Sequence, residues 1–273
     1  AMPLFPEPAR HFVHERFGRK ATPADIAPYV FLPTDAHHVE MLAARWENPR
    51  RITHHYEYLV YTGTYRGLPV TACSTGLGGV STATALEELG RLGAKTFLHL
   101  GLATPLADEL DAGDLVVATG AVRLDGASKG YARPEYPAVA HFEVVMAACA
   151  AAEYLGLPYR TGVVASLAAS SSGRTDGHRL HLTRRMEPVL AELREAGVLG
   201  GAGEEATMFV QAGVYGFRLG SINVCAVDKA AGRIDLSQET RLIGAGLEAM
   251  AILMKWDQNN AAQGLSHSTP PVR

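Results

Sequence analysis

The glycine-rich segment Ser74–Gly79, with the sequence STGLGG, is the stretch of this 273-residue chain whose residue types suggest ligand chemistry most directly. It follows the short apolar run Leu68–Ala72 and leads into a helical pattern that ends at Gly93. Small residues at a junction between a strand and a helix let backbone N–H groups approach a ligand closely, often an anion. Any tight turn of this type also favours glycine, so the loop by itself leaves both interpretations open.

Further polar segments follow apolar runs elsewhere in the chain, and they are candidates for the same site. In parallel α/β sheets the ligand lies beyond the carboxyl ends of the strands, where such segments meet. We therefore expect the glycine-rich loop to be joined there by four other loops: Thr34–His38, Leu102–Pro105, Ser166–Asp176 and Val227–Arg233.

Strand-like and helix-like patterns alternate along the chain, which predicts an α/β fold with a mixed, largely parallel sheet. The run Thr96–Leu100 closes a βαβ unit with Leu68–Ala72, and we expect these two strands to be parallel neighbours. The other predicted strands are Tyr29–Pro33, Tyr56–Tyr65, Leu115–Val122, Arg160–Ala165 and Leu219–Val227. The other predicted helices are Val39–Trp46, Phe142–Leu155, Thr183–Ala196, Glu204–Tyr215 and a last one from the N-cap Ser237 to about Trp256. Leu102–Asp114 and Arg123–Val139 are predicted to be loops.

Composition narrows the class of protein and its partners. The net charge of −3 is small and suggests no polyanionic partner such as nucleic acid. The sequence has no apolar run of about 18 residues or more, so we expect no membrane span. The three cysteines have no metal-ligand spacing, and the N-terminus lacks a secretory pattern, so we expect a cytoplasmic protein.

The pattern divides the chain into three parts. Residues 1–28 are rich in proline and are expected to form an arm, residues 29–257 the folded domain, and residues 258–273 a flexible tail.

Several separated motifs resemble the uridine phosphorylase branch of the nucleoside phosphorylase superfamily. They are CSTGLGGVSTATALEEL, the strand that ends in HLG, AGDLVVATGAVRLDGAS, and PEYPAV. The resemblance extends from about Phe31 to Met254. It implies a three-layer α/β/α domain that assembles as dimers, usually three to a hexamer. It also implies attack of phosphate on C1′ of a nucleoside through an oxocarbenium-like transition state.

The resemblance assigns the ribose to Glu204 in the sequence GEEATMF. A carboxylate accepts hydrogen bonds from two neighbouring hydroxyls, and such charge-assisted bonds are strong. Gly203 occupies the preceding position, where the family has methionine. The alternative is that Glu204 and Glu205 are acids favoured by the helix dipole, which is compatible with a ribose-binding role.

The resemblance places the phosphate, which is the nucleophile, among residues that differ from the family pattern. Two histidines and a tyrosine stand where the family has three arginines, so we expect weak phosphate binding. The residues at the three arginine positions are His38, Tyr56 and His99. The resemblance adds Asp35, Gly78 and Leu102 to the phosphate site. Histidines at strand ends can also be ordinary polar residues. A metal site of His38, His55 and His99 is an open option whose spacing is not diagnostic, and our expectation is that no metal is bound.

The base and the leaving group have matching positions of their own. The base-binding positions are Ala103, Ser170, Arg174 and Asp176, although the 170–176 segment could equally be a solvated loop. Asp228 and Lys229 match the region that assists departure of the base, and their alternative is an exposed ion pair of little energetic value.

The resemblance has further implications outside the nucleoside site. Glu57 and Ser81 match a monovalent-cation site at the dimer interface of some relatives, and no other cofactor is expected. Arg123, Asp125 and Tyr131 are expected to hold a well-matched loop and the dimer contact.

Three functions follow from the sequence. Phosphorolysis of a nucleoside is the family default, whereas hydrolysis or ribosyl transfer is the rival that the lost arginines favour. A non-catalytic nucleoside-binding protein on the same fold is the third.

Overall fold

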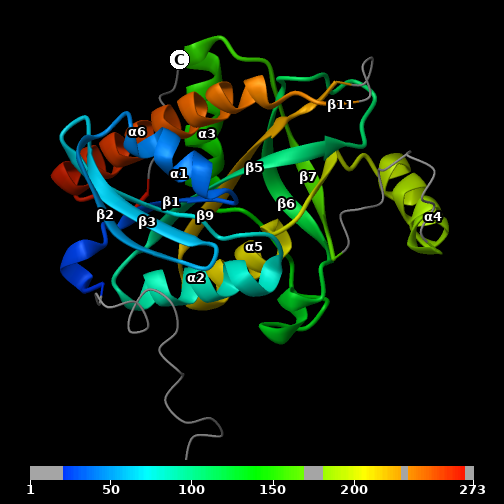
Figure 1. The fold of residues 1–273 in the computed structure, drawn as a ribbon, viewed down its shortest axis with the longest axis horizontal. Helices are drawn as coiled ribbons and strands as arrows, with labels where there is room; N and C mark the ends of the chain where they lie inside the picture. The colour runs from blue at the N-terminus through cyan, green and yellow to red at the C-terminus, as the bar shows by residue number, and fades with distance from the viewer. Residues whose placement is uncertain (1–20, 169–180, 229–232, 268–273) are drawn as a thin grey trace, which may run out of the picture.

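The computed structural model of the chain describes residues 21–168, 181–228 and 233–267 and shows one mixed nine-stranded sheet between two layers of helices (Figure 1). The strands follow the order β2-β3-β4-β1-β5-β8-β7-β6-β9. Helices α1, α3 and α6 lie on one side of the sheet, and α2 and α5 lie on the other (Figure 1). The predicted three-layer α/β/α fold is confirmed.

The strands are β1 (Tyr29–Pro33), β2 (Glu47–His55), β3 (Tyr58–Tyr65), β4 (Leu68–Cys73), β5 (Thr96–Pro105), β6 (Leu115–Leu124), β7 (Tyr159–Leu167), β8 (Gly200–Ala202) and β9 (Arg218–Cys225). The short strands β10 (Val227–Asp228) and β11 (Arg233–Ile234) form a separate pair. The helices are α1 (Ala36–Ala43), α2 (Gly79–Arg91), α3 (Phe142–Leu155), α4 (His181–Glu195), α5 (Glu205–Tyr215) and α6 (Glu239–Gln263). None of these described helices combines the length and apolar character needed to cross a membrane.

One half of the sheet closes on itself. Strand β9 pairs with both β6 and β5, and β8 pairs with both β5 and β7, so that β5, β8, β7, β6 and β9 form a ring. Strand β5 also pairs with β1 on its other edge. It therefore lies at the junction of the ring with the open half of the sheet, and its carboxyl end is fixed by pairing with β8 and β9.

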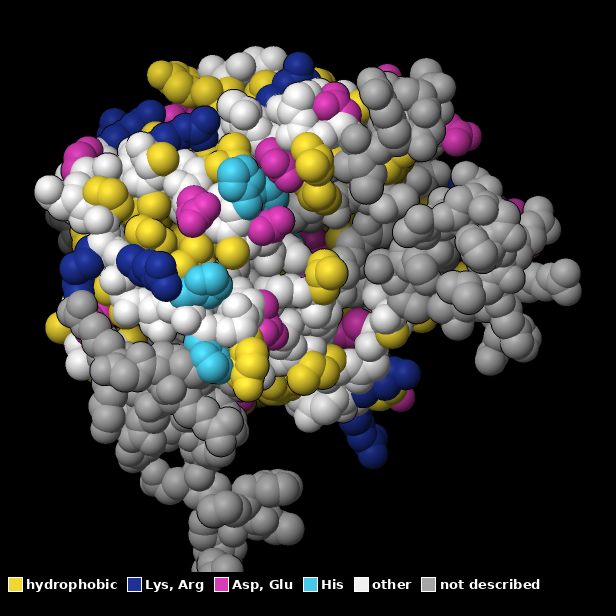
Figure 2. Space-filling model, in the orientation of Figure 1, with side chains coloured by type: hydrophobic (Ala, Val, Ile, Leu, Met, Phe, Trp, Pro, Cys, Tyr) yellow, Lys and Arg dark blue, Asp and Glu magenta, His cyan; other side chains and the backbone are white. Residues whose placement is uncertain are grey.

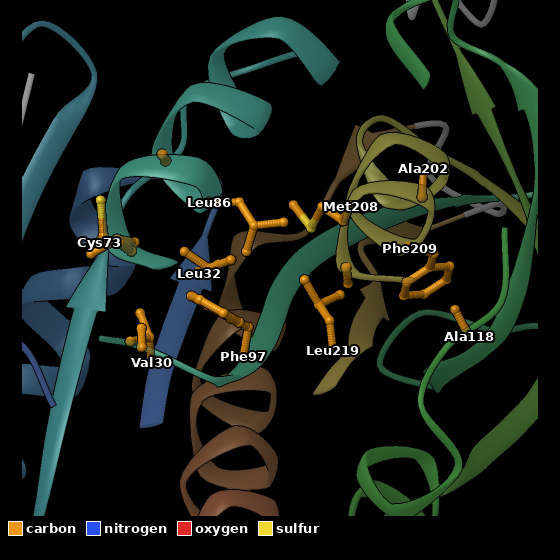
Figure 3. Packing of buried hydrophobic residues seen from close by; sticks show 14 of the residues in the cluster. Val30, Leu32, Cys73, Leu86, Phe97, Ala118, Ala202, Met208, Phe209 and Leu219 are labelled. Atoms are coloured by element: carbon orange, nitrogen blue, oxygen red, sulfur yellow. The ribbon is translucent and has the colours of Figure 1, made fainter. Parts of the chain in front are cut away.

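Apolar residues fill the space on each side of the sheet. One buried cluster lies between the sheet and helices α2 and α5, and it includes Leu86, Phe97, Met208 and Phe209 (Figure 3). A second cluster packs α1, α3 and α6 against the other side. Both helix layers are thus held by the burial of large side chains, which is the main source of stability in such folds.

The βαβ unit forms as predicted, but its two strands are not neighbours. Strand β1 lies between β4 and β5 and runs parallel to both. The prediction that they are adjacent was wrong because the apolar strand Tyr29–Pro33 pairs with β4 on one side and with β5 on the other. A local sequence pattern does not exclude a strand inserted between two others.

Several element boundaries also differ from the predictions. The predicted loop Leu102–Asp114 begins as strand, since β5 continues to Pro105 and pairs with β8. Strand β2 was not predicted, because its first five residues are exposed and polar at the edge of the sheet. Helix α1 begins earlier, because the Asp35 side chain accepts a hydrogen bond from the His37 N–H at its N-terminus.

The two predicted ends of the domain also change. Helix α6 is capped by Gln238 rather than Ser237 and continues to Gln263, where Gly264 in a left-handed conformation ends it. Residues 258–263 therefore belong to this helix and not to a flexible tail. At the other end, Ile26 and Ala27 are buried, so this part of the predicted arm packs onto the domain.

An ion-pair cluster fastens α6 to the sheet. The Arg218 guanidinium at the start of β9 donates to Asp257 Oδ1 at 2.8 Å and to Glu143 Oε2 at 3.1 Å. The Tyr29 hydroxyl donates to the other Asp257 oxygen at 2.6 Å. Burial alone would raise the pKa of Asp257, but the hydrogen bonds from Arg218 and Tyr29 outweigh it and lower the pKa below 3.8.

This cluster yields a prediction about stability. Asp257→Asn should lower the free energy of unfolding by about 1–3 kcal/mol near neutral pH, because a charged partner of Arg218 is lost. A carboxyl with a depressed folded-state pKa stabilises the fold above its ordinary pKa of 3.8 and loses that effect as the pH falls. Urea unfolding at several pH values should therefore show the difference between wild type and variant shrinking in acid. Glu192→Gln, on the exposed surface of α4, is the control, and a difference that grows in acid would contradict the assignment.

Candidate active site

Glu204 stands where the N-termini of two helices meet. It precedes α5, its side chain is buried, and its Oε1 accepts a hydrogen bond of 2.8 Å from the Gly78 N–H at the start of α2. Gly78 has φ of 97°, a conformation that favours glycine. Burial raises the pKa of Glu204, and the neighbouring Glu205 charge adds to this, although His99 and the Gly78 N–H oppose it. The glycine-rich loop thus binds a carboxylate of the chain itself.

His99 on β5 faces the two glutamates at the start of α5. Its Nδ1 lies 2.7 Å from the Leu32 carbonyl oxygen, which only accepts hydrogen bonds, so Nδ1 carries a proton. The other ring nitrogen, Nε2, is 4.0 Å from Glu204 Oε2 and 3.7 Å from Glu205 Oε1. Leu32 on β1 therefore sets the orientation of the imidazole toward both carboxylates.

Glu205 is fully buried beneath this arrangement. Its Oε1 accepts hydrogen bonds from Ser221 Oγ at 3.0 Å and from Asn223 Nδ2 at 2.8 Å. Both partners belong to β9, which pairs with β5 beside His99. From the sequence, Glu205 was expected only to be an acid suited to a helix start. The signal that it had another role was the pair of adjacent acids at the start of an otherwise apolar helix.

A glycine in β5 leaves room for these side chains. A Cβ atom added at Gly101 would lie 2.4 Å from Asn223 Oδ1 and 2.8 Å from His99 Nε2. Both distances are shorter than real Cβ contacts, so any larger residue would displace the imidazole or the amide.

A cavity of about 290 Å³ opens beside Gly78 and beside Gly203, the residue that precedes Glu204. Its walls include Leu77, Gly78 and Val80 from the glycine-rich loop and helix α2, together with Leu167 and Gly203. The volume and position suit a ligand whose polar groups reach the start of α5. A larger hollow of about 560 Å³, between β6 and residues 134–139, contains none of the predicted catalytic residues.

Two of the predicted phosphate residues lie with Glu204, and others make contacts elsewhere in the structure. Gly78 and His99 lie with Glu204, whereas His38 is buried against α6 with Nε2 3.1 Å from Glu239 Oε1. That separation is within ion-pair distance, although the two atoms do not form a hydrogen bond. Asp35 caps α1, and Tyr56 is two-thirds exposed, with its ring 3.9 Å from that of His55.

Leu102 and Ala103 continue β5 beyond His99. Leu102 is partly exposed and Ala103 is buried. The proposed metal grouping of His38, His55 and His99 is not formed. Among the described residues, the histidine, cysteine and acidic side chains whose ligand atoms converge are His99, Glu204 and Glu205.

The other predicted site residues lie outside the described residues or directly before a gap in them. Ser170, Arg174, Asp176 and Lys229 lie outside the described residues. Asp228 is the last residue of β10, where its backbone pairs with Arg233. The assignments of base binding and of the leaving group therefore stay predictions.

The structural role expected of Arg123 and Asp125 is visible. The Arg123 guanidinium donates to the carbonyl oxygens of Ser128, Ala132, Arg133 and Tyr136 and to the Ser128 hydroxyl. Asp125 accepts hydrogen bonds from Ser128 and from Thr207 of α5. Tyr131 packs edge-on against Tyr215, with ring centroids 6.3 Å apart. These contacts tie the 125–136 loop to helix α5, next to the cavity.

Glu57 and Ser81, the predicted cation positions, lie on neighbouring elements. The Tyr58 hydroxyl donates to the Ser81 carbonyl oxygen at 3.0 Å, and the Ser74 hydroxyl donates to the Glu57 carbonyl oxygen. The Glu57 side chain is exposed. A monovalent cation at this place stays a prediction.

Comparison with known proteins places this site in a wider context. A family model described as "Phosphorylase superfamily" matches residues 28–228. The chain is 37% identical over 252 residues to a uridine phosphorylase of Thermococcus kodakarensis, covering 92% of this chain and 91% of the relative. It is 36% identical over 198 residues to a uridine phosphorylase of Escherichia coli, covering 72% and 78%. A guanosine phosphorylase of Halorubrum lacusprofundi is 32% identical over 204 residues, covering 75% and 79%.

The close packing above Gly101 predicts that this glycine is required for activity. Gly101→Ala should lower kcat/KM by about 100-fold, because displacement of a catalytic group by about 1 Å has effects of that size. Gly244→Ala is the matched control, since a Cβ there meets nothing within 4 Å, and it should retain activity. Steady-state kinetics of the two variants, with circular dichroism to verify folding, make the comparison. Equal activity of both variants would show that the arrangement around His99 is not needed.

Proposed function

Because the chain belongs to the phosphorylase superfamily, we propose that its buried Glu204 site cleaves the N-glycosidic bond of a nucleoside by phosphorolysis. The chain is an enzyme of the nucleoside phosphorylase type. A phosphate oxygen forms a bond to C1′ as the bond from C1′ to the base nitrogen breaks. The electron pair of the broken bond goes to the base, which takes up a proton, and the sugar leaves as ribose 1-phosphate.

The position of Glu204 is the observation that carries the proposal. Its buried carboxylate accepts a hydrogen bond from the N–H of Gly78, a residue that lines the cavity, and its other oxygen faces His99. Ribose hydroxyls that enter this cavity can donate to the carboxylate, and charge-assisted bonds of this kind are the strong ones. Burial strengthens them further, because water does not compete.

The phosphate is held less firmly in this proposal than the sugar. Among the described residues His99 is the imidazole that faces Glu204, and the carboxylates of Glu204 and Glu205 beside it repel an anion. A guanidinium group would offer two fixed donors and a permanent charge, which a single imidazole does not. We therefore expect the Michaelis constant for phosphate to be high when these side chains alone bind it, and the nucleoside to contribute most of the binding energy.

The other functions left open by the sequence receive no support from the relatives, which are named as phosphorylases. Hydrolysis, ribosyl transfer and non-catalytic binding are accordingly outcomes of the test. The purified enzyme with a panel of pyrimidine and purine nucleosides should release free base only when phosphate is present, and ribose 1-phosphate should accumulate. Release of free ribose without phosphate would contradict the proposal.

The role of Glu204 predicts a specific kinetic effect. Glu204→Gln should lower kcat/KM for the nucleoside by roughly 10- to 100-fold, because charged hydrogen bonds of about 1.5–3 kcal/mol become neutral ones. Glu87→Gln, in an exposed pair with Arg91 on α2, should change it little and serves as the control. If Glu204→Gln retains full kcat/KM, the ribose does not bind this carboxylate.

We further propose that a second copy of the chain covers the mouth of this cavity. Leu77 and Val80 line the cavity, yet their side chains are 84% and 75% exposed. Large apolar side chains exposed together indicate an interaction surface. The dimer or hexamer expected from the sequence would cover them.

This assembly has its own test. Val80→Asp should shift the molecular mass measured by light scattering toward that of a monomer, because a charge is costly in an apolar interface. Tyr154→Asp changes an exposed residue of α3, which lies in the opposite helix layer, and it should leave the mass unchanged. A wild-type protein that is already monomeric at micromolar concentration would contradict the proposal.

A further inference from the structure

Three buried side chains at the floor of the site direct ligand atoms toward one point. His99 Nε2, a carboxylate oxygen of Glu204 and one of Glu205 all lie within 4.8 Å of one another. The two imidazole-to-carboxylate distances, 3.7 Å and 4.0 Å, are longer than hydrogen bonds. The three groups therefore surround a space instead of bonding to each other.

Each of these groups is oriented by a partner outside the space. The Leu32 carbonyl oxygen accepts a hydrogen bond from the Nδ1–H of His99, which leaves the Nε2 lone pair directed inward. The Gly78 N–H holds Glu204, and residues of β9 hold Glu205. Histidine ligands of metal ions almost always donate their other N–H to a carboxylate, a backbone carbonyl or a water, and the carboxylate ligands are hydrogen-bonded in turn.

A fourth atom gives an independent indication. Asn223 is fully buried, and its Nδ2 donates to Glu205 and to Ser221. Its Oδ1 has no hydrogen-bond partner among the described residues. Oδ1 and His99 Nε2 both border the position that a Gly101 side chain would fill, at 2.4 Å and 2.8 Å. A buried amide oxygen without a partner is costly, and a cation beside it would satisfy it.

The charges in the site also need compensation. Two carboxylates are buried here, and within the described part of the chain no lysine or arginine forms an ion pair with either of them. Removing carboxylates from water without a cationic partner is strongly unfavourable. A divalent cation between two carboxylates and a neutral imidazole would leave the group uncharged.

We propose that His99, Glu204 and Glu205, together with the Asn223 amide oxygen, bind a divalent first-row transition metal ion. One imidazole nitrogen with three oxygens suits Zn²⁺ or Mn²⁺ better than Mg²⁺ or Ca²⁺, which favour oxygen ligands alone. This departs from the expectation that no metal is bound. Given the proposed function, the ion would supply the positive charge that phosphate requires and that this site does not obtain from arginine.

Metal binding can be measured without any nucleoside, so its failure is distinct from failure of the proposed function. Chelator-treated protein is titrated with Zn²⁺ and with Mn²⁺ by calorimetry. We expect one ion per chain at this site. Glu205→Gln should raise the dissociation constant of the metal ion at least about tenfold. Glu195→Gln, exposed on α4, should bind as the wild type does. No saturable binding, or equal binding by wild type and Glu205→Gln, would overturn the inference.

The location of the ion provides the second measurement, which does not depend on a variant that folds. Figure 2 shows histidine side chains beside acidic ones at the surface, and these could bind the same ions weakly. Crystals of the wild-type protein soaked in Mn²⁺ or Zn²⁺ should give an anomalous peak within bonding distance of His99 Nε2 and Glu205. Anomalous peaks only at surface histidines, with none between the buried groups, would overturn the assignment.

Discussion

The hydrogen bond from the Gly78 N–H to the Glu204 carboxylate is the contact on which the site depends. It joins the N-termini of α2 and α5, two helices that pack against the same side of the sheet but are separated by more than a hundred residues in sequence. Each N-terminus carries a partial positive charge that stabilises the carboxylate. Because α2 and α5 are held by their own apolar faces, the carboxylate is positioned by the core rather than by a flexible loop.

The closed half of the sheet determines what faces this carboxylate. Strand β5 brings His99 opposite Glu204, and the pairing of β5 with β9 brings Ser221 and Asn223 beneath Glu205. Two acids and one imidazole are thereby buried together, a combination that is unfavourable unless a substrate, a proton or a cation completes it. Burial of these groups lowers the stability of the fold, and it leaves a site whose groups are positioned to bind a charged or hydroxyl-rich ligand.

The sequence was sufficient for the layers and for most elements, because these depend on local periodicity and on motifs. It was insufficient where partners come from distant segments. The contact of His38 with Glu239 was not predicted, because Glu239 belongs to α6, a helix that no local pattern connects to α1. The place of His38 beside the phosphate stays a prediction. Glu205 was missed because an acid at a helix start is ordinary, and only the pairing of β5 with β9 shows that it is buried beside His99. The insertion of β1 between β4 and β5 is a choice of topology that apolar runs alone do not specify.

The claim that a sugar is bound by Glu204 is tested most directly by a crystal structure with a bound nucleoside. The account predicts that the 2′ and 3′ hydroxyls lie within hydrogen-bonding distance, about 2.5–3.0 Å, of the Glu204 carboxylate, with C1′ on the side of His99. The base should then lie in the cavity that Leu77 and Leu167 border. A nucleoside bound elsewhere, with Glu204 still bonded only to Gly78, would contradict the account.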